Sequence, residues 1–434
     1  MMNWTPLLLI PVLMAALMEM PLFTVIAGIS SVCLYAAGRD WLSLQVVFIE
    51  MNRLASTPVL VALPLFTFIG CLLTRTAAPQ RIMNLIRTLT GRLPGGVAIA
   101  ALGSCAFFTA LTGASGVTIV AMGAILYPVL RQRAYHDSFT LGLLTTSGSL
   151  GLLFPPSLAV ILYGVIAQIP ISDIFTAALI PGVMLVLLLS LYATIHRSVT
   201  GRSSAPDSDA ERLVSWAEVK KRLRESLWDL PILVLLVVGV YGGFVTIAEV
   251  SAVILVYVVV VECFVLKEVK FFRHLPEVMV ESAVLSGAII IILGFALGFT
   301  GYLVDEQIPN RILNQLITLT ANKYVFLAGL NLFLLAVGCI MDIFSAIVII
   351  VPIIVPIAMQ YGVDPIHLAV IFLVNLEIGY STPPVGINLF IASLTFKQPV
   401  TRLYRASIPY LVLLLVALAV ITYLPDLSLW LLGK

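Results

Sequence analysis

Long apolar segments alternate with short polar connections along most of this chain, and two of the segments are interrupted by consecutive prolines. Stretches long enough to cross a bilayer lie near residues 4–18, 20–37, 55–75, 138–169, 174–196, 229–246, 247–266, 281–303, 367–396 and 404–425. Pro155-Pro156 interrupts the fourth stretch, and Pro383-Pro384 interrupts the ninth. Because proline has no amide hydrogen and disfavours helix at the preceding residue, each pair predicts a helix that is broken at membrane depth. The freed carbonyl groups are tolerated there only inside protein or beside a water-filled cavity.

The two interrupted segments belong to an internal duplication. Adding 228 to a residue number in the first half relates Pro128 to Pro356, Gly151 to Gly379, Pro155-Pro156 to Pro383-Pro384 and Pro181 to Pro409. Matches at one ungapped offset indicate two related halves. We place the first repeat over residues 1–197, a cytoplasmic linker over 198–228 and the second repeat over 229–434. Each repeat holds one more apolar stretch with a polar or glycine-rich centre, at 95–130 and at 323–358.

The positive charges predict how the repeats are oriented. Arginines lie on both sides of the 95–130 stretch, at Arg75, Arg81, Arg87, Arg92, Arg131 and Arg133. The positive-inside rule places both ends of this stretch in the cytoplasm, as for a re-entrant hairpin. Residues 360–365 carry no lysine or arginine, so the second hairpin enters from the opposite side. The first cation of the chain is Arg39, which predicts a periplasmic N-terminus. We expect an all-α polytopic membrane protein with inverted repeats, two re-entrant hairpins and two broken helices.

The composition agrees with a membrane protein. Of the 434 residues, 61% are hydrophobic and only 11% are charged, and the mean hydropathy is +1.11. Soluble domains carry about 25% charged residues. The net charge of +2 gives no electrostatic basis for nucleic-acid binding. The five cysteines form no C-x-x-C pair and are typical of small core residues.

The centres of the two hairpin stretches carry the first candidate ligands. In Thr112–Gly116, glycines let the chain reverse, and hydroxyl groups can bind a cation or freed backbone groups. The alternative for this segment is helix packing through small residues. The second centre, Met341–Ser345, carries Asp342, a carboxylate within an apolar run. Asp342 either binds a cation or caps the half-helix that follows it.

The two proline breaks supply further groups. Carbonyl oxygens around 147–154 and 379–382 can replace the hydration shell of a sodium ion, while the half-helix N-termini after each proline pair suit a carboxylate substrate. Glu377 precedes the second break. It either hydrogen-bonds freed backbone or takes part in substrate or proton binding. Asn388 follows the same break by one turn and either binds the substrate or packs as a buried amide.

Three segments resemble the large membrane subunit of TRAP transporters. They are Ser147–Gly164, Asn375–Phe390 and Gly242–Glu249, the last of which is similar to the family's G-x-F-T-P-T-E stretch. The likeness covers essentially the whole chain. It implies a sodium-driven elevator permease of the bacterial inner membrane, which imports a small organic acid delivered by a periplasmic solute-binding protein. It also implies a small four-helix membrane subunit, which we expect as a separate chain.

Transferred residue by residue, the resemblance implies two sodium sites. The first comprises Gly113, Ser115, Ser147, Gly148 and Gly151, and the second comprises Met341, Asp342, Gly379 and Thr382. The substrate is expected to contact Thr118, Ser149, Pro155, Pro156, Ser157, Pro383, Pro384 and Asn388. The chain departs from the family pattern at the first tip (T-G-A-S-G for S-G-S-S), at Tyr380 and Ser381 where leucines are common, and at Ile247 where proline is usual. These departures leave open which side chains, rather than carbonyl groups, hold the ions.

Two other functions remain as alternatives. A single-component sodium/dicarboxylate symporter of similar architecture would need neither a binding protein nor a small subunit. The tetrapeptide Gly113–Gly116 also fits the G-x-S-G of rhomboid intramembrane proteases, in which the serine needs a histidine base. The four histidines lie at loops or membrane edges, at His136, His196, His274 and His367. We therefore expect no enzyme, no catalytic residue and no organic cofactor.

Overall fold

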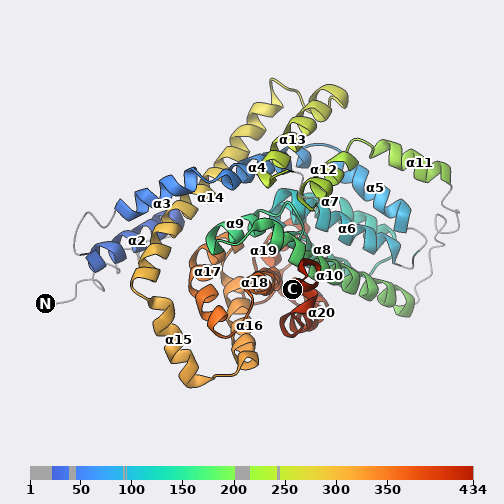
Figure 1. Cartoon of the computed structure of the whole chain (residues 1–434). Helices are drawn as coiled ribbons and strands as arrows, with labels where there is room; N and C mark the ends of the chain where they lie inside the picture. Colours follow the sequence, from blue (N-terminus) through green and yellow to red (C-terminus); the bar gives the residue numbers. More distant parts are fainter. Residues whose placement is uncertain are drawn as a thin grey trace.

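The computed structural model describes residues 22–38, 45–90, 93, 95–200, 216–241 and 245–433. Within these ranges the chain is helical and contains no strand (Figure 1). Six helices in the described part of the chain are long and apolar enough to cross a membrane, and the number rises to eight if each of two bent helix pairs counts as one span. The prediction of an all-α polytopic membrane protein is confirmed. The predicted span 4–18, the N-terminus, residues 201–215 of the linker and residues 242–244 lie outside the described residues.

One group of helices, which we call the frame, includes the long helix α14. It comprises α2 (Leu22–Gly38), α3 (Gln45–Ala55), α4 (Ala62–Thr74), α5 (Ala78–Thr90), α11 (Trp216–Glu225), α12 (Leu230–Tyr241), α13 (Ile247–Val260) and α14 (His274–Asp305). Helix α14 packs against α2, α3 and α4, and α13 packs against α4 and α12. Helix α13 begins with a capping box, in which Thr246 and Glu249 satisfy each other's backbone amides. Helices α4 and α5 meet at an angle of 77°.

The second group, which we call the body, begins each half with a hairpin of helices. The first hairpin is α6 (Gly96–Thr112) with α7 (Ser115–Gln132), and the second is α16 (Lys323–Ile340) with α17 (Ile343–Gln360). Adding 228 to the bounds of α7, 115 and 132, gives 343 and 360, which are the bounds of α17. The offset found among the prolines therefore relates whole helices. Helix α15 (Ile308–Leu319) connects the frame to the second hairpin.

Each half of the body continues with a broken helix and a long helix. In the first half, α8 (Asp137–Ser147) is followed by the 3₁₀ turn η3 (Leu150–Leu153), α9 (Leu158–Ala167) and α10 (Ile171–Thr200). The second half has α18 (Pro365–Gly379), α19 (Ile387–Phe396) and α20 (Val400–Tyr423). Both proline pairs lie in the gaps between half-helices, each with a cis peptide bond. The predicted broken helices are confirmed, whereas the boundaries of the two repeats stay predictions.

Two related glycines hold the broken helices against the hairpins. A Cβ atom on Gly151 would lie 2.2 Å from the carbonyl oxygen of Ala106 on α6, and one on Gly379 would lie 2.6 Å from the carbonyl carbon of Gly338 on α16. Such distances leave no room for a methyl group. The same close backbone approach therefore occurs in both halves, which explains why glycine stands at both positions.

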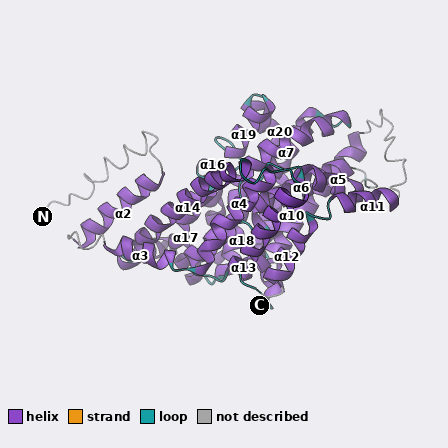
Figure 2. Cartoon of the chain, turned by 90° about the horizontal axis from the view of Figure 1, so that it is seen from above, coloured by secondary structure: helices purple, strands orange, loops and turns teal. Residues whose placement is uncertain are grey.

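Helix α18 lies near the centre of the body (Figures 1 and 2). It packs against α10, α16, α17 and α20, and every residue from Ile366 to Gly379 is buried. A helix buried on all sides offers its polar side chains to protein neighbours rather than to lipid or open water. The polar residues Asn375 and Glu377 on this helix therefore need a structural or functional reason.

Candidate functional site

The tip of the first hairpin packs on the first break. Gly113 ends α6 with a φ of +66°, in the left-handed region that favours glycine. A Cβ atom there would lie 2.6 Å from the side chain of Leu158, the first residue of α9. A Cβ atom on Gly148, just after α8, would lie 3.3 Å from the carbonyl oxygen of Ser115. The structure thus brings Gly113, Ser115 and Gly148 of the predicted first sodium site together.

A threonine that sequence reasoning missed joins the same hairpin to the break. The hydroxyl of Thr109 donates to the carbonyl oxygen of Gly148 at 2.7 Å and lies 2.9 Å from the hydroxyl of Thr118. Both threonines are fully buried. The only signal in the sequence is a hydroxyl side chain in the apolar helix α6. These contacts fix the orientation of a carbonyl group that the break has freed.

The tip of the second hairpin is organised by Asp342. Its Oδ2 atom accepts a hydrogen bond from the amide of Ser345 at 3.0 Å, and its Oδ1 atom accepts one from the Ser345 hydroxyl. Asp342 is therefore the N-cap of α17, one of the two roles that the sequence left open. The cation-binding role stays a prediction. The amide of Ile343 donates to the hydroxyl of Tyr380, which joins this tip to the second break.

The loop after α18 is held by the end of α16. The Sγ atom of Cys339 donates to the carbonyl oxygen of Thr382 at 3.1 Å, and the amide of Gly386 donates to the carbonyl oxygen of Cys339 at 3.0 Å. Thr382 and Gly379 of the predicted second site are thus close to the second hairpin. Their positions reproduce the arrangement of the first half, in which the hairpin also supports the break.

One hydrogen bond crosses from the first tip to the second break. The hydroxyl of Ser115 donates to Oδ1 of Asn388 at 2.7 Å, and the backbone N–H of Asn388 donates to the carbonyl oxygen of Tyr380 at 3.0 Å. Asn388 is completely buried. Ser115 therefore pairs with an amide rather than with a histidine, which gives no support to the protease alternative.

A cavity of about 820 Å³ separates the two hairpin tips from the frame. Its lining includes Gly113 and Ser115 of the first tip, Leu152 of the first break, and Asp342 and Tyr380 around the second tip. The frame contributes Arg75 and Glu281. Pockets of about 300–1,000 Å³ are typical for small ligands. Both tips and both breaks therefore border one space that is large enough for a small organic molecule.

The predicted site residues do not all line this cavity. Pro155 lines a separate apolar cavity of about 300 Å³ between α6, α10 and α12. The hydroxyl of Ser149 lies within hydrogen-bond distance of two carbonyl oxygens, those of Thr146 at 3.3 Å and Glu377 at 3.4 Å. The remaining residues of the predicted set are not among those that line the larger cavity, and they are Thr118, Ser147, Gly148, Gly151, Pro156, Ser157, Met341, Gly379, Thr382, Pro383, Pro384 and Asn388. Their ion and substrate contacts stay predictions.

Several buried polar atoms at the breaks have no hydrogen-bond partner among the described residues. They are Oγ of Ser157, both carboxylate oxygens of Glu377, Oγ of Ser381 and Nδ2 of Asn388. Buried polar atoms in native proteins are almost always paired with protein, water or a ligand. Such atoms also occur away from the breaks, for example at Ser30 and Ser428, so they do not by themselves identify a ligand site.

The cavity also contains a charged group that the sequence analysis treated only as an orientation signal. Arg75 lies at the bend between α4 and α5, where it donates to Glu281 at 2.6 Å and to Glu277 at 3.2 Å. Both glutamates belong to α14. The arginine side chain is 41% exposed and forms part of the cavity lining. Its neighbourhood is set by tertiary packing and could not be read from the sequence.

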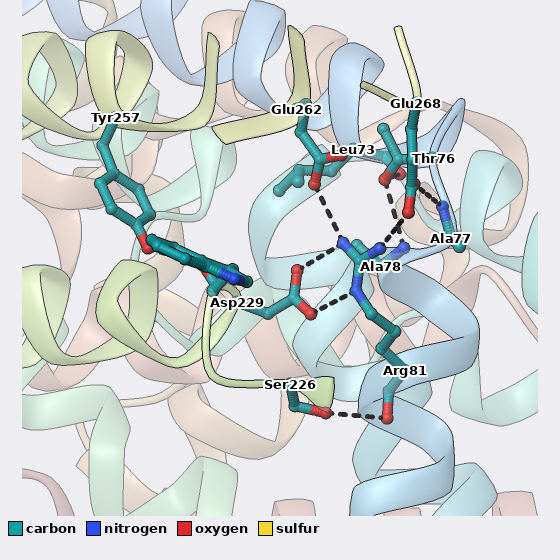
Figure 3. Close-up of polar contacts among 11 residues, drawn as sticks. Leu73, Thr76, Ala77, Ala78, Arg81, Ser226, Asp229, Tyr257, Glu262 and Glu268 are labelled. Atoms are coloured by element: carbon teal, nitrogen blue, oxygen red, sulfur yellow. Dashed lines mark hydrogen bonds and ion pairs between the residues drawn. The ribbon is translucent and has the colours of Figure 1, made fainter. Parts of the chain in front are cut away.

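A second arginine ties the frame together at the same bend (Figure 3). Arg81 of α5 donates to both carboxylate oxygens of Asp229 at 2.7 and 2.9 Å, to Glu262 at 3.0 Å and to Glu268. Glu268 also accepts from the amide of Ala77 at 2.6 Å, just before α5 begins. These contacts fix α5 to the start of α12 and the end of α13.

Comparison with solved structures shows the same fold in another transporter. The chain matches a structure titled as the crystal structure of the Alcanivorax borkumensis YdaH transporter, with an unusual topology. The TM-score is 0.64 at 15% sequence identity, and the match covers 91% of this chain and 90% of the other. At this identity the likeness concerns the fold alone.

Sequence comparisons identify the family. The chain is 34% identical to the C4-dicarboxylate TRAP transporter large permease protein DctM of Pseudomonas aeruginosa, over 89% of both chains. It is 32% identical to the isethionate TRAP transporter permease protein DctMQ of Oleidesulfovibrio alaskensis, over 89% of this chain and 60% of the relative. A family model described as the DctM component of the tripartite ATP-independent periplasmic transporter matches residues 7–427. Together with the paired hairpins and broken helices, these matches show that the chain belongs to the family of TRAP transporter large permease subunits.

Proposed function

We propose that this chain is the sodium-coupled permease of a tripartite system that imports a small organic acid. The observation that carries the proposal is the single cavity bordered by both hairpin tips and both proline breaks. Half-helix N-termini carry partial positive charge and suit an anion, whereas freed carbonyl groups carry partial negative charge and suit a cation. Such a site can hold an anion and its coupling cations side by side.

Sodium fits the groups that the breaks offer. The candidate ligands near the first tip are carbonyl and hydroxyl oxygens, and the second tip adds the carboxylate of Asp342. Hard cations prefer oxygen ligands of this kind. Within the described ranges, no group of three or more histidine, cysteine or acidic side chains could hold a metal ion. The donors therefore suit sodium rather than a transition metal.

A carboxylate or a related acid fits the substrate side. Relatives are named for C4-dicarboxylates, for isethionate and for ectoine, and each of these small molecules carries an acid group. Arg75 lines the cavity from the frame, and Nδ2 of Asn388, beside the second break, has no hydrogen-bond partner among the described residues. Both groups donate hydrogen bonds, and an arginine can pair with a carboxylate through two of them.

The proposed mechanism is an elevator movement of the body against the frame. The hairpins and broken helices carry the ions and the substrate. The frame stays in place, and the ion pairs of Arg81 hold its helices together. We further propose that the chain works in the bacterial inner membrane with a separate small four-helix subunit and a periplasmic solute-binding protein. One relative is named DctMQ, and the match to this chain covers only 60% of that relative. The rest of the relative is long enough to hold a fused small subunit, whereas we propose a separate one here.

Transport by the reconstituted system tests the proposal. The binding protein is first screened for thermal stabilisation by C4-dicarboxylates, isethionate and other organic acids. Uptake of the acid so identified is then measured in proteoliposomes that contain this chain and the small subunit. We expect uptake to require both an inward sodium gradient and the binding protein. Uptake of free acid by this chain alone would instead favour the single-component symporter.

A further inference from the structure

A short loop at residues 266–273 joins two helical segments that are long and apolar enough to cross a membrane. The first segment runs from Ile247 to Val265, and the second is α14, which begins at His274. A short connection between two membrane-spanning helices lies where the hydrocarbon of the bilayer meets the lipid headgroups. We call residues 266–273 the interface loop.

The inner side of the interface loop is fixed to the frame. The backbone amides of Glu268 and Val269 donate to the carbonyl oxygen of Glu262 at 3.0 and 3.2 Å. The carboxylate of Glu268 pairs with Arg81 and accepts from the amide of Ala77 (Figure 3), and Val269 is buried. The loop therefore has a fixed orientation relative to the bend between α4 and α5.

Three phenylalanine rings gather on the outer side. The ring centroids of Phe264 and Phe271 are 5.4 Å apart, and those of Phe271 and Phe272 are 5.2 Å apart. Phe264 is 57% exposed and Phe272 is 93% exposed. Contact of such apolar surface with water is unfavourable, and phenylalanine is typical of segments that bury side chains at the boundary between headgroups and acyl chains. The rings therefore suit that boundary.

The outer side also carries positive charge that nothing in the frame neutralises. The exposed cations of the loop are Lys267, Lys270 and Arg273. In the described part of the chain, none of the three has an ion-pair partner. The neighbouring acids are already paired, since Glu268 bonds Arg81 and Glu277 bonds Arg75. The free charge of the loop is therefore available to an anion outside the protein.

The loop lies on the same side of the membrane as the predicted cytoplasmic linker. Arg81 pairs both with Glu268 in the loop and with Asp229, which directly follows that linker. The cations of the loop agree with a cytoplasmic position by the positive-inside rule. Anionic lipids at the cytoplasmic surface attract basic segments beside membrane-spanning helices. The charge of the loop is thus complementary to the headgroups around it.

We propose that the interface loop is a binding surface for anionic phospholipids. Its three cations pair with lipid phosphate groups, and its three phenylalanine rings insert among the first methylene groups of the acyl chains. An acidic protein would also pair with the cations, but the bilayer is what surrounds a loop between two spans. Because Glu268 and Arg81 join the loop to the helix bend, the bound lipid holds the frame at a fixed depth. This role is independent of the acid that is carried.

Thermal unfolding with added lipid tests the charge contacts. The full-length chain is purified in a neutral detergent and titrated with phosphatidylglycerol, which is anionic, or with phosphatidylcholine, which has no net charge. A lipid that binds the folded chain raises its melting temperature, and we expect this rise with phosphatidylglycerol. In Lys267→Gln/Lys270→Gln/Arg273→Gln the lipid concentration for half of the effect should increase about tenfold or more, since each cation contributes about fivefold.

A second triple variant is the matched control for charge. Lys220→Gln/Lys221→Gln/Arg224→Gln removes three exposed cations from α11, close to the same linker. It has the same change in net charge but leaves the interface loop intact, so its lipid dependence should stay near that of the unmodified chain. Equal losses in the two triple variants would show that only the total charge matters and would overturn the proposal. So would equal stabilisation of the unmodified chain by the two lipids.

Fluorescence quenching tests the insertion of the rings. Phe272→Trp adds emission to that of the native tryptophans, and the difference from the unmodified chain reports on position 272. In nanodiscs of phosphatidylglycerol and phosphatidylcholine with brominated acyl chains, we expect the added emission to be quenched. Quenching by aqueous iodide alone would show that the side chain faces water and would refute insertion.

Coexpression with the small subunit separates lipid from a protein partner. If the small subunit abolishes the quenching by brominated lipid, the loop is a protein interface and the lipid proposal is wrong. Persistent quenching supports the lipid surface. Neither measurement involves sodium or transport, so a negative result would leave the proposed uptake function untouched.

Discussion

Ser149 and Glu377 stand 228 positions apart and touch each other, because the hydroxyl of Ser149 lies 3.4 Å from the carbonyl oxygen of Glu377. Equivalent positions of a duplicated fold contact one another only close to the axis that relates the two halves. The axis of this fold therefore passes between the two broken helices, near the proline pairs. The two breaks consequently lie side by side in the body.

Asp342 variants separate capping from ion binding. Asparagine keeps an oxygen that can accept from the amide of Ser345, whereas alanine removes the cap, which costs about 1 kcal/mol. We expect Asp342→Asn to keep near-normal thermal stability but to weaken the sodium dependence of uptake, and Asp342→Ala to lower both. Unchanged sodium stoichiometry in the asparagine variant would show that Asp342 is only a cap.

The close backbone contacts at the breaks predict a paired stability effect. A methyl group at Gly151 or Gly379 would meet backbone atoms at 2.2 and 2.6 Å, and overpacking of this kind costs about 1–3 kcal/mol. We expect alanine at either position to lower the melting temperature of the purified chain. Gly329 of α16 is the matched control, because nothing lies within 4 Å of a Cβ atom there. Alanine at Gly329 should be neutral or stabilising, and equal effects at all three positions would contradict the packing described.

The hydrogen bond between Ser115 and Asn388 can be measured by a double-mutant cycle. Ser115→Ala leaves the buried amide oxygen of Asn388 without its donor, at a cost of about 1–3 kcal/mol. Asn388→Ala should cost a similar amount, and the double variant should cost clearly less than the sum. Additive effects on the unfolding free energy would show that the two side chains do not pair in the membrane-embedded protein.

The two arginines at the bend of the frame should differ in importance. Arg81 is 13% exposed and forms ion pairs with three carboxylates. Because Arg81→Ala leaves buried carboxylates unpaired, it should lower the free energy of unfolding by about 3–5 kcal/mol. Arg75 is 41% exposed, and loss of its ion pairs should cost at most about 1 kcal/mol. We expect Arg81→Ala to reduce the yield of folded protein sharply. Arg75→Ala should fold and instead change the apparent KM for the acid, and an unchanged KM would exclude Arg75 from the substrate path.

The sequence predicted the helix breaks and the hairpin turns of this fold at the correct positions. Proline pairs break a helix wherever they occur, since the missing amide hydrogen and the steric clash are properties of the residue itself. The breaks at Pro155-Pro156 and Pro383-Pro384 therefore lie where the sequence places them, and so do the hairpin turns beside Gly113 and Asp342. By contrast, Pro128 and Pro356 lie inside continuous helices, because neighbouring helices can compensate for one lost hydrogen bond.

The sequence by itself determined the apolar helices, their two interruptions and the duplication, because hydrophobicity and backbone chemistry act over a few residues. Only the tertiary structure decided which groups meet. The pairing of Ser115 with Asn388, the support of Gly148 by Thr109 and the entry of Arg75 and Glu281 into the cavity join residues from separate helices. Such contacts depend on how the helices pack, and no pattern along the chain encodes the distance between two side chains that lie hundreds of residues apart.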